Sequence, residues 1–392
     1  MKQSFYLAIK YLQFHRIRTL VLVASIGLIL YLPNGLQRLI SESEIQMMAR
    51  ADATPLIVGA KGNSTDLVIN TLYFEQQEIE PVSLKTVDLL NQTGFGYSIP
   101  ILSAFKAREY PIVGTNLDYF DFRNLNIEEG RTLRYVGECV IGSRVARRLN
   151  LKPGDSLISS PENFFDLAGV YPLRMEVVGI LRTSNTPDDL AVFTDLKTNW
   201  VIMGLGHGHD DLQKVYDPTL VLKRDSSNVT ASAKLYIYNE ISGKYLGSFH
   251  FHGNIEDYPI TSVLFIPDDK KSATILRGRF ESGAMEDQIV VPGLVVENLL
   301  QSIFRIKQIF NTVFILVGVA TLLILGLIVI LTLRLRKEEL YTMFTIGSSR
   351  YKITEIIGFE LIITLVLSLV VATILYGITG YFVEDFIRQF II

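Results

Sequence analysis

The chain has 392 residues, with 37 Lys and Arg against 40 Asp and Glu, and its formal net charge is −3. This balance gives no sign of a nucleic-acid partner. The single cysteine, Cys139, excludes an internal disulfide, so a soluble domain in this chain must rely on its hydrophobic core.

Three apolar segments have the length of membrane spans. Thr19–Leu36 follows an amphipathic stretch and is interrupted by Pro33 and Asn34. Thr312–Leu333 and Leu361–Thr379 are uninterrupted and carry no charge. At about 1.5 Å of rise per residue, about 20 residues cross a hydrocarbon core of about 30 Å. The sequence therefore predicts three transmembrane helices. A cleaved signal peptide is disfavoured, because the first apolar stretch starts late and no small-residue cleavage site follows it.

Basic residues next to these segments predict the orientation of the chain. One group precedes the first segment and the other lies between the last two: Lys2, Lys10, Arg16 and Arg18, then Arg334, Arg336, Lys337, Arg350 and Lys352. Because such residues concentrate on the cytoplasmic side, we expect the N-terminus and the short link in the cytoplasm. The large domain and the C-terminal tail then lie outside.

This topology predicts seven segments. They are a cytoplasmic amphipathic elbow (1–15), the first transmembrane helix with a stalk (16–45), an extracytoplasmic domain (46–300), a stalk with the second transmembrane helix (301–335), a cytoplasmic coupling helix (336–354), the third transmembrane helix (355–383) and an outer C-terminal tail (384–392). The extracytoplasmic domain, about 260 residues long, is large enough for a core of its own, and we expect two subdomains.

Short β-rich runs and helical stretches alternate in this domain, which predicts a mixed α+β fold. The predicted strands are Pro55–Val58, Tyr110–Val113, Glu138–Ile141, Leu173–Ile180, Leu220–Leu222, Lys234–Tyr238, Ser262–Ile266 and Gln288–Val291. The predicted helices are Val82–Asn91, Ser143–Leu149, Lys271–Phe280 and Val295–Phe304, the last leading toward the membrane.

Motifs of nucleotide binding and hydrolysis are missing from the sequence. Val58–Thr65 contains glycine, lysine and hydroxyl residues, but not in the G-x-x-x-x-G-K-[ST] order of a phosphate loop. The sequence has neither a G-x-S-x-G nor an H-E-x-x-H motif. We therefore expect no catalytic site in this chain.

Two H-x-H pairs are candidate metal ligands. They are His207 with His209, and His250 with His252. If the second pair is on an extended strand, both of its side chains point to one face, because side chains alternate along a strand. Two such pairs would supply four ligands to Zn²⁺. The alternative is a polar surface loop beside an exposed strand face.

The link before the last apolar segment is amphipathic. Its charged start is followed at near-helical spacing by Leu340, Met343, Phe344 and Ile346, and Gly347–Ser348–Ser349 then breaks the helix. This pattern predicts a short helix at the inner membrane face whose apolar side is available to a partner. A simple re-entry turn is the alternative.

This link resembles the cytoplasmic segment of FtsX/MacB-type ABC transporter permeases, which reads roughly R-x-x-E-[IL]-x-x-[LM]-x-x-[IL]-G-[AS]-S/R-R and docks into the ATPase. The matching positions are Arg336, Glu339, Leu340, Met343, Ile346, Gly347, Ser348, Ser349 and Arg350, and Phe344 lies among them. Val58–Leu72, Val140–Gly154 and Val177–Leu181 resemble segments of MacB-like extracytoplasmic domains.

The resemblance implies a non-catalytic permease of the bacterial inner membrane, with a large MacB-like domain in the periplasm. It implies a separate cytoplasmic ABC ATPase dimer that binds ATP and Mg²⁺, and a second permease copy, identical or paired. A periplasmic adaptor or lipoprotein and membrane lipid are further implied partners, and the chain itself holds no cofactor. Because the family has four transmembrane helices, we expect either a three-helix variant or the loss of the fourth.

Small residues follow one face of the last apolar segment. Thr364, Ser368, Ala372 and Gly380 recur at intervals of four or eight, in register with Glu360. Small residues allow helices to approach closely in lipid, so this face is predicted to pack on the 312–333 helix or on its copy in a dimer. Glu360 is expected to be charged and solvated.

Two other functions stay open. One is an FtsX-like regulator of cell-wall hydrolases, although the predicted outer domain is larger than such a regulator needs. The other is a membrane-anchored sensor or metal-binding protein that uses the two H-x-H pairs and has no ATPase.

Overall fold

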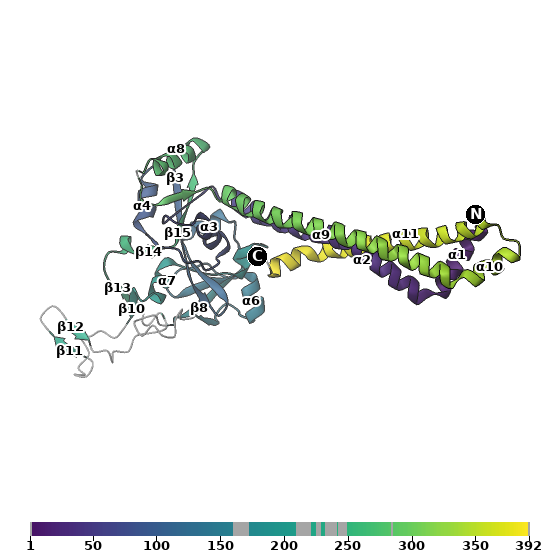
Figure 1. The fold of residues 1–392 in the computed structure, drawn as a ribbon. Coiled ribbons are helices and arrows are strands. Elements are labelled where there is room, and N and C mark those ends of the chain that lie inside the picture. Colours follow the sequence, from purple (N-terminus) through teal and green to yellow (C-terminus); the bar gives the residue numbers. More distant parts are fainter. Residues whose placement is uncertain are drawn as a thin grey trace. The chain divides into compact units, whose positions relative to one another are not determined.

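A computed structural model describes residues 2–159, 172–208, 221–224, 229–231, 241, 249–283 and 285–390 (Figure 1). The chain divides into two units. We call Met1–Met47 with Leu299–Ile391 the helical unit, and Met48–Asn298 the sheet unit.

Long helices dominate the helical unit. Its elements are α1 (Lys2–Phe14), α2 (Arg16–Asp52), α9 (Pro292–Leu335), α10 (Lys337–Thr345) and α11 (Arg350–Phe390). α2 and α9 are continuous across the boundary between the units, because each has its outer end in the sheet unit. The residues 295–304 and 312–333, which the sequence suggested as two helices, therefore belong to one helix.

Pro33 lies inside α2 and does not end it. Proline removes one backbone donor, yet a membrane helix tolerates this loss when nearby groups satisfy the freed backbone. Next to it, the Asn34 side-chain amide donates a hydrogen bond of 2.9 Å to the carbonyl oxygen of Leu30.

Two helices among the described residues are long and apolar enough to span a membrane. They are Arg16–Asp52 and Arg350–Tyr381, and α9 contributes a shorter apolar stretch, Thr312–Ile324. The number of three transmembrane helices therefore stays a prediction. α11 continues through Phe390, so the described part of the predicted tail is the end of this helix.

The sheet unit is built on one mixed sheet. Within the described residues this sheet has ten strands in the order β16-β1-β15-β3-β4-β9-β6-β8-β5, with β7 paired to β8. Its strands are β1 (Leu56–Gly59), β3 (Gly96–Ala107), β4 (Tyr110–Gly114), β5 (Ile127–Gly130), β6 (Glu138–Ile141), β7 (Ser156–Ile158), β8 (Arg174–Leu181), β9 (Val192–Thr194), β15 (Ser262–Pro267) and β16 (Gln288–Val290). The β4–β9 and β6–β8 pairs are parallel, and the other pairs are antiparallel.

Helices and short strands surround this sheet. The helices are α3 (Ser64–Tyr73), α4 (Lys85–Asn91), α5 (Asp118–Phe122), α6 (Ser143–Leu149), η1 (Pro187–Leu190), α7 (Leu196–Ile202), η3 (Ile255–Asp257) and α8 (Lys270–Glu281). The short strands are β2 (Val82–Ser83) with β14 (Pro259–Ile260), β10 (Gly206–Gly208) with β13 (Phe249–Phe251), and β11 (Val221–Arg224) with β12 (Val229–Ala231).

Two hydrophobic clusters lie on this sheet. One gathers around Cys139, Val177 and Val192, and the other around Val58, Phe265 and Trp200. The long strand β3 contributes side chains to both clusters, because Leu102 belongs to the second cluster and Phe105 to the first. The two clusters thus share one sheet.

Most of the predicted strands are confirmed. Tyr110–Val113, Glu138–Ile141 and Ser262–Ile266 all fall within observed strands, and the Ser143–Leu149 helix has the predicted bounds. The Val82–Asn91 prediction was wrong in its first part, because Val82 and Ser83 pair with β14 and the helix begins only at Lys85. Lys234–Tyr238 lies outside the described residues.

A buried ion pair fixes the last turn of α2 within the sheet unit. Arg50 Nη1 lies 2.7 Å from Asp188 Oδ2, and Arg50 Nη2 lies 3.1 Å from Asp188 Oδ1. Arg50 Nε donates to the carbonyl oxygen of Leu72 at the end of α3, and the Tyr119 hydroxyl donates to Asp188 Oδ1 at 2.6 Å. The pair therefore joins α2 to α3, α5 and η1, with every charged atom hydrogen-bonded.

Asp188 stays ionised in this cluster. Burial by itself would raise its pKa, but the Arg50 charge and the hydrogen bonds from Arg50, Tyr119 and Thr186 lower the pKa from 3.8 to about 2. Burial raises the pKa of Tyr119, so its hydroxyl keeps its proton and remains a donor.

Replacing Arg50 should destabilise the sheet unit. Because Arg50→Met leaves Asp188 buried without its partner, we expect the free energy of unfolding to fall by about 3–5 kcal/mol. Denaturant unfolding of the full-length protein in detergent, followed by fluorescence of the single tryptophan, Trp200, measures this loss. Arg277→Met is the control, because it removes only an exposed pair with Glu281, worth less than about 1 kcal/mol. Equal losses in the two variants would contradict a stabilising role for the buried pair.

The lowered pKa of Asp188 predicts a dependence of stability on pH. A carboxylate with a lowered folded-state pKa contributes its stabilisation above the unfolded pKa and loses it as the pH falls through the folded value. We expect a loss of about 2 kcal/mol between about pH 4 and pH 2 in the parent, beyond any loss seen in Asp188→Asn. Unfolding of both proteins across this range tests it, and parallel profiles would refute it.

Candidate functional site

The predicted cytoplasmic link forms α10 and a tight turn into α11. The backbone N–H of Ser348 donates to the Met343 carbonyl and that of Gly347 to the Phe344 carbonyl, each at 3.0 Å. This pair of bonds is the Schellman ending of a helix, in which the residue after the cap adopts a left-handed conformation. Gly347 has a φ of 103°, which favours glycine at this position.

The next residues of the motif begin α11. Ser349 Oγ accepts a hydrogen bond of 3.3 Å from the backbone N–H of Lys352, as an N-cap side chain does. The Arg350 guanidinium lies 5.6 Å from the centre of the Phe344 ring, a cation–π contact across the turn. Gly347, Ser349 and Arg350 thus determine how α10 meets α11.

The link exposes apolar side chains, which we call the apolar tip. Its members are Tyr341, Phe344, Ile346 and Tyr351, of which Phe344 is 46% exposed and Ile346 is 82% exposed. Leu340 and Met343 are half-buried. The Glu339 side chain lies outside the described part of the structure. Exposed apolar groups in one place on a link are typical of a surface that binds a partner.

Arg336 faces the interior of the helical unit. Its Nη1 donates to both Glu360 carboxylate oxygens at 3.1 Å, and its guanidinium lies 3.6 Å from the centre of the Tyr11 ring. Glu360 is 7% exposed, so the expectation of a solvated Glu360 was wrong. Tyr11 of α1 covers the pair, and it lies far from both residues in the sequence. The helical periodicity of the link therefore did not predict that Glu360 is buried.

α1 packs against the first half of α11. Ser4 Oγ donates to Glu355 Oε2 at 3.0 Å, and the Phe5 and Phe359 rings meet edge to face with centroids 5.6 Å apart. Together with Tyr11, these contacts join α1 to the residues on both sides of the apolar tip. The predicted elbow is therefore a packed part of the helical unit.

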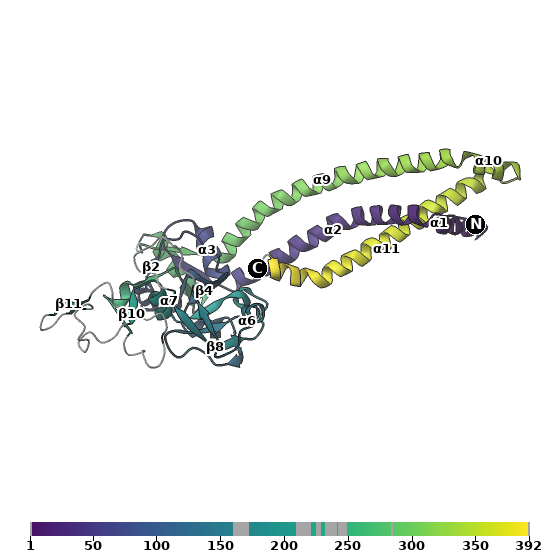
Figure 2. The same ribbon diagram turned by 90° about the horizontal axis from the view of Figure 1, so that it is seen from below.

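The small residues of α11 face α2. Thr364, Ser368 and Ala372 are buried, and a Cβ atom on Gly27 of α2 would lie 3.1 Å from the Ser368 carbonyl oxygen. Figure 2 shows the two helices side by side. Within the chain their neighbour is thus α2, whereas the sequence analysis named the 312–333 helix or a second copy.

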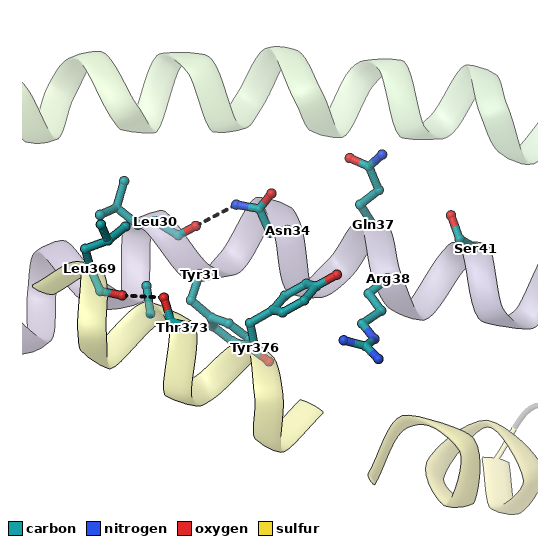
Figure 3. Close-up of a pocket in the computed structure, with 10 residues that line it drawn as sticks. Leu30, Tyr31, Asn34, Gln37, Arg38, Ser41, Leu369, Thr373 and Tyr376 are labelled. Atoms are coloured by element: carbon teal, nitrogen blue, oxygen red, sulfur yellow. Dashed lines mark hydrogen bonds between the residues drawn. The ribbon is translucent and has the colours of Figure 1, made fainter. Parts of the chain in front are cut away.

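The two helices line a partly open cavity further along. It has a volume of about 580 Å³ and is lined by six residues of α2 between Leu30 and Ser41 and by four residues of α11 between Leu369 and Tyr376 (Figure 3). At its edge the Tyr31 and Thr379 hydroxyls share a hydrogen bond of 2.5 Å. Gly380, also on the predicted packing face, lies against Arg38.

The structure brings part of the histidine set together. The rings of His250 and His252 lie 4.8 Å apart, and His207 is opposite His250 in the β10–β13 register. His209 and the side chain of His207 lie outside the described residues. Among those described, no three His, Cys, Asp or Glu residues are grouped to hold a metal ion.

Comparisons with known proteins identify a family. Residues 21–234 match the family model of the MacB-like periplasmic core domain. A comparison with curated proteins found no match.

Three solved structures are similar to this chain, each at low identity. The periplasmic region of MacB from Actinobacillus actinomycetemcomitans has 12% identity and a TM-score of 0.35, and the match covers 64% of this chain and 97% of that one. The extracellular domain of the transporter YknZ from Gram-positive bacteria has 12% identity and a TM-score of 0.32, with 60% and 99% covered. A domain of a putative permease protein from Porphyromonas gingivalis has 10% identity and a TM-score of 0.27, with 60% and 85% covered.

Removing Arg336 should loosen the link. Because Arg336→Met leaves the Glu360 carboxylate buried without its partner, we expect hydrogen exchange in α10 and the following turn to speed up by about tenfold or more. Lys352→Met is the matched control, because it breaks only the exposed pair with Glu355. Hydrogen–deuterium exchange of the full-length protein measures both variants, and unchanged exchange in Arg336→Met would show that the pair does not hold α10.

Proposed function

Because the chain belongs to the MacB-like periplasmic core domain family, we propose that it is the permease subunit of a MacB/FtsX-type ABC transporter. The chain is a membrane protein with an extracytoplasmic domain, which corresponds to the sheet unit. In this proposal α2, α9 and α11 cross the bacterial inner membrane. The N-terminus and the apolar tip then lie in the cytoplasm.

The apolar tip is the observation that carries this proposal. Its exposed side chains project from a link whose position is held by the Arg336–Glu360 pair and by α1. An apolar helix face of this kind fits a groove in a partner protein. The proposed partner is a cytoplasmic ABC ATPase dimer, which holds ATP and Mg²⁺, while this chain is not itself an enzyme.

The mechanism follows the contacts of the link. Closure of the ATPase dimer on ATP displaces α10, and the Arg336–Glu360 pair passes the displacement to α11. α9 is joined to α10 and extends as one helix into the sheet unit, so it carries the same displacement to the extracytoplasmic domain. A second permease copy, identical or paired, would occupy the other half of the ATPase dimer.

This displacement of the extracytoplasmic domain would act on molecules outside the membrane. Export, extraction of a lipoprotein or lipid, and the transmission of force to an outer assembly all use a domain that moves without a solute pore. A periplasmic adaptor or a lipoprotein is a proposed partner for the sheet unit.

One observation favours a metal-binding sensor as a second candidate. The rings of His250 and His252 lie 4.8 Å apart, and His207 lies opposite His250 in the β10–β13 register. Zn²⁺ is titrated into the parent protein and into His250→Ala, and the function of both proteins is compared. The sensor candidate expects the substitution to weaken Zn²⁺ binding and to reduce function. The permease proposal expects the parent and His250→Ala to function equally well.

A glutamate on the apolar tip should abolish ATPase binding. Phe344→Glu places a charge that would be buried without a partner in the complex, so we expect at least about a tenfold loss of ATPase recovered with the tagged full-length protein in mild detergent. Met343→Glu and Leu340→Glu should act in the same direction. Mass spectrometry of the purified complex measures the recovery.

Leu89→Glu in α4 is the matched control, because Leu89 is 48% exposed, close to the value for Phe344, but lies in the sheet unit. It should leave ATPase recovery unchanged. Full recovery and function with Phe344→Glu would refute the coupling role of the tip.

A further inference from the structure

In the topology proposed above, the cavity between α2 and α11 lies at the depth of the outer lipid headgroups. Arg16 and Arg38 are 22 positions apart on α2, which is about 33 Å along a helix and close to the hydrocarbon thickness of about 30 Å. Since α2 continues beyond Arg38 into the extracytoplasmic unit, Arg16 marks the inner surface and Arg38 the outer surface.

The lining of the cavity changes in polarity along the two helices. Leu30 and Leu369 lie at its deeper end, nearer the middle of the membrane (Figure 3). Gln37, Arg38 and Ser41 lie at its other end, where Gln37 and Ser41 point to one side of α2 and Arg38 points to the other. An apolar inner end and a polar, cationic outer end match the order of groups in a phospholipid.

Arg38 presents its charge at the outer end of this cavity. Its guanidinium lies 4.8 Å from the centre of the Tyr376 ring and directly against Gly380. A Cβ atom at Gly380 would lie within 2.5 Å of the guanidinium carbon, so glycine leaves the space in which Arg38 lies. Among the residues that the structure describes, Arg38 forms no ion pair, which leaves its planar set of donors available to an anion.

We propose that this cavity binds one anionic phospholipid of the outer leaflet. The lipid phosphate accepts hydrogen bonds from Arg38, because guanidinium groups bind phosphate with two parallel N–H···O bonds. Gln37 and Ser41 offer donors to the glycerol and its substituents, and an acyl chain follows the apolar residues toward Leu30. The volume of about 580 Å³ is typical of a ligand site and holds the headgroup region. This site requires membrane insertion but no ATPase, so it goes beyond the proposed function.

Native mass spectrometry of the full-length protein tests the site. The protein is exchanged into detergent containing dioleoylphosphatidylglycerol or, separately, zwitterionic dioleoylphosphatidylcholine. We expect one retained phosphatidylglycerol on the parent and at least about a tenfold smaller retained fraction on Arg38→Gln. Arg16→Gln is the matched control, because it removes the same charge from the inner end of the same helix.

A second variant keeps the guanidinium in place. The double variant Gln37→Ala with Ser41→Ala retains Arg38 and should weaken retention by about threefold, because it removes only hydrogen bonds to the uncharged glycerol region. Size-exclusion profiles and Trp200 fluorescence like those of the parent show that each variant is folded.

Three results would overturn the proposal. Equal losses in Arg38→Gln and Arg16→Gln would mean a non-specific charge effect. Equal retention of the two lipids would mean that the cavity does not recognise an anion. Displacement of the lipid by millimolar inorganic phosphate would mean that the site recognises free phosphate and not a lipid.

Discussion

A hydrocarbon core leaves backbone polar groups no partner except each other, and this constraint determines the shape of the long helices. About 20 residues are enough to cross, yet α2 and α11, which are long and apolar enough to span a membrane, contain 37 and 41 residues, and α9 contains 44. The extra residues of α2 and α9 lead into the sheet unit without a loop. Each of these two helices therefore passes from the helical unit to the sheet unit without a break.

The two ends of this helical system use different physical chemistry. At the end that carries α10, a polar pair, Arg336 with Glu360, is buried under Tyr11, while apolar side chains are left exposed on α10. Burying the charges positions the link, and exposing the apolar groups leaves binding energy for a partner. In the cavity between α2 and α11 the Arg38 guanidinium lies at one end, and Leu30 and Leu369, which are 41% and 54% exposed, lie at the other.

Local signals predicted much of this structure from the sequence. The break at Gly347–Ser349 was predictable because a left-handed glycine and an N-capping serine each act within four residues. β3 was missed because Gly96, Pro100 and Ser103 interrupt its apolar pattern. The two buried ion pairs were not predictable, since their partners lie 24 and 138 positions apart and nothing near either residue marks the other. The packing face of α11 could be read from its small residues, but only the fold shows that its neighbour is α2.

The geometry of the Arg50–Asp188 pair has a consequence for torsion. Two parallel bonds between a planar guanidinium and a planar carboxylate fix an angle as well as a distance. Turning α2 about its own axis would rotate the guanidinium out of that plane and break both bonds before the helix had turned far. The pair therefore fixes the rotation of the last turn of α2 about its own axis within the sheet unit, as well as its position.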